Sequence, residues 1–107
     1  MATIDLETAA NGSLIWETVT GGDVGQPLPL PRGGAQLAVH ALGTFGDTLT
    51  LQGTIDGTNW FPLLTSPGGD VVTFTAAGYA EICTAVKAIR PSAGASISDV
   101  DVLVSVF

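Results

Sequence analysis

Few residues in this 107-residue chain have the types and spacing that chemistry requires. Histidine is the usual general base near neutral pH, and His40 is the single histidine. The single cysteine, Cys83, has no activating base among its sequence neighbours. Asp99 and Asp101 stand two residues apart, so a strand would place both on one face, where they could share a hard cation or act as paired acids. Solvated carboxylates, a structural thiol and a surface or interface histidine explain the same residues, and we expect these roles.

Recognised catalytic motifs are also missing from the sequence. It contains no Gly-x-Ser-x-Gly nucleophile turn and no glycine-rich phosphate loop ending in Lys and Ser or Thr. One cysteine can form neither an intramolecular disulfide nor a multi-cysteine metal site. We therefore expect a protein that binds without catalysing, with no cofactor and no metal.

The charge balance excludes further classes. Ten acidic residues face three basic ones, which gives a net charge of −7. Three cations cannot neutralise many phosphates, so we expect no nucleic-acid partner. No apolar run approaches the length of a membrane-spanning helix, and we expect no membrane contact. The first residues carry two acids and no apolar segment, which is not a signal peptide and suggests synthesis in the cytoplasm.

Alternation of apolar and polar residues with a period of two dominates the chain. Residues 48–55 place Leu49, Leu51 and Ile55 on one face and polar residues on the other. In residues 99–107 the valines at 100, 102, 104 and 106 share one face. Weaker strand patterns occur over residues 13–20, 35–42, 60–64, 71–76, 78–86 and 88–93. Pro91 marks the last of these as an edge strand or a bulge.

These runs predict an all-β protein. Eight or so short strands separated by Gly, Asn and Asp turns are typical of a single antiparallel β-sandwich, here expected to be of jelly-roll type. Residues 76–88 are the closest approach to a helix, but Gly78 and the β-branched Ile82, Thr84 and Val86 favour a strand. Apolar residues make up 46% of the chain, enough to form a core in a domain of this size.

The amino-terminal third contains a different kind of segment. Between Gln26 and Gly34 a proline stands at every second position from Pro27 to Pro31, which fixes φ and removes donors. We expect an extended arm or a connector there. Within what we expect to be one domain overall, we therefore distinguish an amino-terminal strand with this arm or connector (1–33) from a β-sandwich body (34–107). Leu28 and Leu30 need an apolar surface, on this domain or on a neighbouring subunit.

Large apolar side chains supply the candidates for a partner interface. Trp60 and Phe61 are adjacent, so a strand points them to opposite faces, and one of the two is expected in the core. Leu103 and Phe107 share the polar face of the last strand with Asp101. The full candidate set is Trp16, Leu28, Leu30, Trp60, Phe61, Leu103 and Phe107.

Residues 34–107 carry a set of motifs that resembles a known family. Gly43-Thr44-Phe45-Gly46-Asp47-Thr48-Leu49-Thr50-Leu51-Gln52-Gly53, then Asp56-Gly57-Thr58-Asn59-Trp60, then Thr73-Phe74-Thr75-Ala76 and Ile89-Arg90-Pro91 are similar to segments of small tailed-bacteriophage virion accessory proteins of the capsid-decoration (cement) type. The resemblance implies a β-sandwich structural protein on the capsid exterior. Its partners would be the major capsid protein and further copies of itself, for example as a trimer.

Two other classes remain open at this point. A carbohydrate-binding module could use Trp60 or Trp16 as a stacking platform for a sugar ring. A tail or head–tail structural component would show the same composition and strand pattern as a capsid protein.

Overall fold

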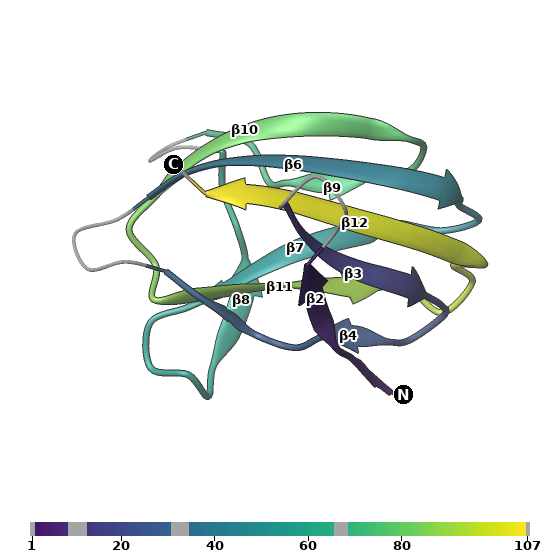
Figure 1. Ribbon diagram of the computed structural model, residues 1–107, viewed down its shortest axis with the longest axis horizontal. Coiled ribbons are helices and arrows are strands. Elements are labelled where there is room, and N and C mark those ends of the chain that lie inside the picture. Colours follow the sequence, from purple (N-terminus) through teal and green to yellow (C-terminus); the bar gives the residue numbers. More distant parts are fainter. Residues whose placement is uncertain (1, 9–12, 31–34, 66–68, 107) are drawn as a thin grey trace.

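Two β-sheets pack against each other in the computed structural model, which describes residues 2–8, 13–30, 35–65 and 69–106 (Figure 1). Sheet A contains β1 (Thr3–Ile4), β4 (Val24–Gly25), β5 (Leu28–Pro29), β7 (Leu49–Thr54), β8 (Trp60–Pro62), β9 (Thr73–Phe74) and β11 (Ala88–Ala93). Sheet B contains β2 (Leu6–Thr8), β3 (Leu14–Val19), β6 (Ala35–Thr44), β10 (Gly78–Thr84) and β12 (Asp99–Val106). Within the described ranges no helix is long and apolar enough to cross a membrane.

The expected all-β sandwich is confirmed, and each of the eight expected strands has a counterpart. Sheet B runs in the order β10-β6-β12-β3-β2, and sheet A runs β1-β4-β11-β7-β8, with β5 also on β11 and β9 also on β7. All pairings are antiparallel except that of β1 with β4, which is parallel. The segment around Gly78 is strand β10, as its β-branched residues favoured.

The core lies between the sheets and follows the period-two alternation. Along β6, Leu37, Val39 and Ala41 are buried, and along β12 the valines at 100, 102 and 104 are buried. These strands are neighbours in sheet B, so their inward faces form one continuous apolar surface. Leu49, Leu51 and Ile89 of sheet A complete the opposite side of the core.

Trp16 on β3 of sheet B packs against sheet A where β4 pairs with β11. Its side chain is 0% exposed, and its indole Nε1 donates a hydrogen bond to the main-chain oxygen of Gln26 at 2.9 Å. Gly25 leaves the space that this contact needs, because a Cβ there would lie 2.6 Å from the indole Nε1 and 2.4 Å from the Pro91 ring. The burial of Trp16 therefore depends on a close approach of β4 to β3 and β11.

The proline-rich segment is a connector over the residues that the structure describes. Residues 26–30 run along sheet A, where Leu28 pairs with Ile89 and is 8% exposed. Leu30 is half-buried against the core, and its N–H donates to the Lys87 oxygen at 2.8 Å. An arm that leaves the domain is not observed here; residues 31–34 lie outside the described ranges.

Each of the two sheets contains strands that precede residue 33 in the sequence and strands that follow it. β3, with its fully buried Trp16, lies between β12 and β2, and β4 pairs with β11. The described residues of the first third of the chain thus contribute strands to both sheets.

Pro91 lies inside a sheet rather than at an edge or a bulge, which corrects the expectation from sequence. β11 pairs with β7 along its length and with β4 and β5 on its other side. The N–H of Leu51, opposite Pro91, donates to the Val72 oxygen, and the Leu51 oxygen accepts from the Leu63 N–H, both on the far side of β7. Pro91 therefore occupies a non-hydrogen-bonded position toward β7, and its missing donor faces the gap between β4 and β5.

The hairpin turn after β7 is held by one carboxylate. Asp56 accepts hydrogen bonds from the main-chain N–H groups of Thr58 and Asn59, both at 2.8 Å, and Gly57 has a φ of 81°. These bonds hold the pKa of Asp56 well below its usual range. Ile55, expected inward with Leu51, is 62% exposed because the strand has already ended at Thr54.

We predict that Trp16→Phe lowers the free energy of unfolding by about 2 kcal/mol, through a cavity and an unpaired Gln26 oxygen. Trp60→Phe is the matched control, because Trp60 is half-buried at the surface, and it should cost less than about 1 kcal/mol. Urea unfolding followed by far-UV circular dichroism measures both values. Equal losses for the two variants would contradict the central position of Trp16.

Candidate interaction surface

The outer face of sheet B carries a row of large uncharged side chains across its central strands. The strand registers place Ile15, Leu103, His40 and Tyr79 side by side, from β3 through β12 and β6 to β10. Tyr79 is 68% exposed, His40 is exposed and Leu103 is half-buried. Ile15 is largely covered but lies outside the core cluster, as its outward position requires.

Two small side chains and one glutamate form the next row toward the carboxyl end of β12. Ser105 on β12 lies opposite Ala38 on β6, and Ala38 lies opposite Glu81 on β10. Beyond this row, Gln36 pairs with Cys83. Ala38 and Ser105 therefore lie lower than Leu103 and Gln36 on either side, and Glu81 stands at the β10 end of their row.

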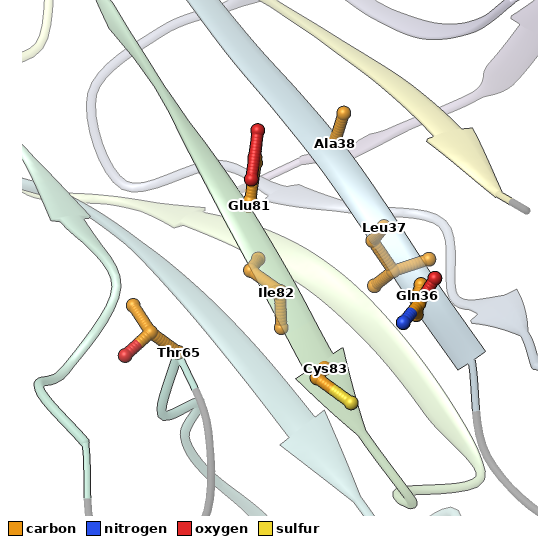
Figure 2. A pocket seen from close by; sticks show the side chains of 7 residues that line it. All are labelled: Gln36, Leu37, Ala38, Thr65, Glu81, Ile82 and Cys83. Atoms are coloured by element: carbon orange, nitrogen blue, oxygen red, sulfur yellow. The ribbon is translucent and has the colours of Figure 1, made fainter.

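Two hollows follow this low row and share Ala38. One has a volume of about 350 Å³, and Tyr79, Leu103 and Ser105 are among the residues that line it. The other, about 420 Å³, is lined by Gln36, Leu37, Ala38, Thr65, Glu81, Ile82 and Cys83. Figure 2 shows the second hollow where β10 and β6 lie side by side, with Thr65 beyond the edge of β10 that faces away from β6. The Cys83 N–H donates to the Thr65 oxygen at 2.9 Å, which fixes that boundary.

Charges on this face are acidic and lie toward its margins. Glu81 is on the edge strand β10 and Glu7 on the edge strand β2, while the exposed Glu17 lies toward the end of β3 and Asp99 and Asp101 at the start of β12. The two bases of the described ranges lie elsewhere: Lys87 precedes β11, and Arg90 is in β11 of sheet A. The row of Ile15, Leu103, His40 and Tyr79 at the centre of the face therefore contains no carboxylate, lysine or arginine.

Asp101 also holds the backbone of the neighbouring strand. The Thr18 N–H donates to its carboxylate at 2.9 Å, at the point where the register between β12 and β3 shifts. Thr18 has a φ of 57°, a left-handed conformation that suits a bulge. No three His, Cys, Asp or Glu residues of the described ranges gather into a group that could hold a metal ion.

His40 and Cys83 share this face but not a site. Cys83 pairs with Gln36 and Tyr79 pairs with His40, so four residues separate the two positions along the paired strands. That spacing corresponds to about 13 Å, too far for a base to activate a thiol.

The outer face of sheet A offers a different chemistry at Trp60. The guanidinium of Arg90 lies over the indole ring, 4.1 Å from its centroid, and the Arg90 Nε donates to the Gln52 side-chain oxygen at 2.9 Å. Burial lowers the pKa of Arg90. One face of the indole is thus covered by a cation within the same domain.

The remaining interface candidates divide by burial. Trp16 and Leu28 are buried, so neither side chain is available at the surface of this fold. Leu30 and Trp60 are half-buried, and Phe61 is 38% exposed beside a hollow of about 210 Å³ that Leu64 and Val86 also line. Leu103 lies on the outer face of sheet B, and Phe107 lies outside the described residues.

Sequence reasoning missed two structural carboxylates. Asp23, almost completely buried, accepts bonds from the Thr20 side chain at 2.8 Å and from the main-chain N–H of Ala2 at 3.1 Å. The Thr20 bonds lower its pKa most. Asp47 accepts from the N–H groups of Thr48 and Ser96, which lowers its pKa. For Asp23 the spacing Thr-x-x-Asp was the available signal.

Comparisons with known proteins add one similarity in structure. No family model matches the chain, and no curated protein matches it. The crystal structure of the SPBc2 prophage-derived protein YomS matches with a TM-score of 0.61 and 12% identity, over 87% of this chain and 93% of that chain. At this identity the likeness concerns the fold alone.

We predict that acid destabilises the domain through the carboxylates with lowered pKa values. Their contribution is complete above the ordinary aspartate pKa of 3.8 and is lost as the pH falls through their lower folded-state values. Asp23→Asn should therefore lower the stability at neutral pH and flatten its decline below about pH 4. Urea unfolding across this pH range measures the slope, with the exposed Asp5→Asn as the control. An unchanged slope in Asp23→Asn would contradict this role.

Proposed function

We propose that this protein is a non-enzymatic virion structural protein that decorates and stabilises a phage capsid by binding the assembled shell. The observation that carries the proposal is the outer face of sheet B, which combines an uncharged centre with two adjoining hollows. Two further points support it: the fold is shared with a prophage-derived protein, and residues 34–107 resemble capsid-decoration proteins.

The size of the face suits this role. The five strands of sheet B contain three to ten residues, so at about 3.3 Å per residue and about 4.8 Å between strands the face measures on the order of 500 Å². A stable protein interface uses about 800 Å² from each partner. The face can therefore supply most of one side of such an interface.

Stabilisation would follow from mass action. A protein that binds the assembled shell but not its separated subunits stabilises the shell by about 2.7 kcal/mol at a concentration one hundred times its Kd. The major capsid protein is the proposed partner, with self-association into a homo-oligomer such as a trimer. The proposed location is the exterior of the virion, after synthesis in the host cytoplasm.

The strand order also supports a jelly-roll description of the fold. Strands β3, β12, β6 and β10 are neighbours in sheet B, and β4 or β5, β11, β7 and β8 are neighbours in sheet A. The chain passes between the sheets from β6 to β7 and from β10 through β11 to β12, as two nested Greek keys require.

Carbohydrate binding is a weaker candidate. Arg90 already covers one face of Trp60, and Trp16 is fully buried, so neither offers a free ring in the manner of a stacking platform. A tail or head–tail component differs from the main proposal only in the structure to which it binds.

We predict that the purified protein cosediments with empty capsids of its source phage and raises their melting temperature, since binding favours the assembled state. Isolated tails from the same phage are the matched control. Binding to tails but not to capsids would move the protein to the tail. Failure to sediment with either would contradict the proposal.

A further inference from the structure

The low row on the outer face of sheet B forms a groove between two higher rows. Ala38 and Ser105 form its floor, Leu103 and Tyr79 belong to the row on one side, and Gln36 with Cys83 forms the row on the other. We use the name Ala38 groove for this feature. Because Ala38 lines both hollows, the groove runs from β12 across β6 to Glu81 on β10.

The chemistry of the groove changes along its length. Toward β12 it is lined by Leu103 and the exposed Tyr79, which favour an apolar or aromatic side chain. Toward β10 it is lined by Gln36 and the carboxylate of Glu81, which favour a donor or a cation. An elongated side chain with an apolar stem and a polar or basic end fits both parts.

The surrounding charges indicate the kind of protein that would supply it. Asp99, Asp101, Glu7 and Glu81 lie on this face, and no lysine or arginine of the described ranges does. In a two-fold contact a second copy would bring these same carboxylates against one another, and in a ring it would bring them against a chain with a net charge of −7; like-charge repulsion disfavours both. A surface that carries lysine and arginine around an apolar projection is complementary instead.

We propose that the Ala38 groove is the docking site for the shell protein, and that the shell protein contributes a projecting side chain flanked by basic residues. This inference rests on the proposed function and deepens it by naming the surface and the chemistry of the partner. A second copy of this chain is not the occupant of the groove, so self-association would use another surface.

The test fills the groove and reverses its charge in separate variants. Ala38→Tyr places a bulky neutral side chain on the floor, and Glu81→Lys reverses the charge at the β10 end. Thr73→Tyr makes the first kind of change at an exposed position of sheet A, and Asp5→Lys makes the second between β1 and β2. Cosedimentation with empty capsids measures the apparent Kd, and thermal unfolding checks that each variant is folded.

We expect Ala38→Tyr and Glu81→Lys each to weaken capsid binding by about tenfold or more, while both controls bind like the wild type. If the wild type and both groove variants bind capsids equally well, the groove is not the docking site, although the proposed function is still supported. An equal loss of capsid binding in the two control variants would also overturn the groove as the docking site, without contradicting the proposed function. If the wild type itself does not bind, the proposed function fails first.

Sedimentation velocity tests the other candidate occupant of the groove, a second copy of this chain. Conversion of an oligomeric wild type to a monomer by Ala38→Tyr, with Thr73→Tyr unchanged, would assign the groove to a second copy and overturn the proposal. If Ala38→Tyr fails to fold, Glu81→Lys alone decides, because Glu81 is exposed and its side chain lies outside the core.

Discussion

The period-two geometry of β6 and β12 constrains both faces of sheet B at once. Burying Leu37, Val39 and Ala41 with the valines of β12 forms the core, and the same alternation turns the intervening side chains outward. A one-residue slip would expose the valines and bury His40, so the register is strongly specified. The surface proposed for binding is therefore held in place by the free energy that folds the domain.

The sequence predicted the long strands well because their alternation is local. It also predicted which residues of β12 face outward, including Leu103. It did not predict β1, β2, β4 and β5, since the two or three residues of each show no alternation, whereas the equally short β8 and β9 lie within longer patterns. Strands β1, β4 and β5 also depend on partners more than 20 residues away along the chain. For the same reason it placed Pro91 at an edge or a bulge, whereas the gap between β4 and β5 accommodates Pro91 inside sheet A.

The sequence likewise predicted only part of the candidate surface. Leu103 was found from parity alone, but Tyr79, His40 and Ala38 join it only through the register between strands that are distant in sequence. Trp16 was expected as a surface candidate, yet the turn through Gly25 brings the Gln26 oxygen to its indole and buries it. The described residues of the first third of the chain form strands of both sheets. The structure therefore supports partner binding through a sheet face better than partner binding through an extended amino-terminal arm.

The single cysteine allows the most direct test, because Cys83 is exposed and lines the Ala38 groove. The measurement is the rate at which a thiol reagent modifies Cys83 in the free protein and in the capsid-bound protein. We expect strong protection in the bound state, and no protection of a thiol placed on sheet A by Thr73→Cys in a Cys83→Ser background. Equal reactivity of Cys83 in both states, or protection of position 73 instead, would contradict docking through the outer face of sheet B.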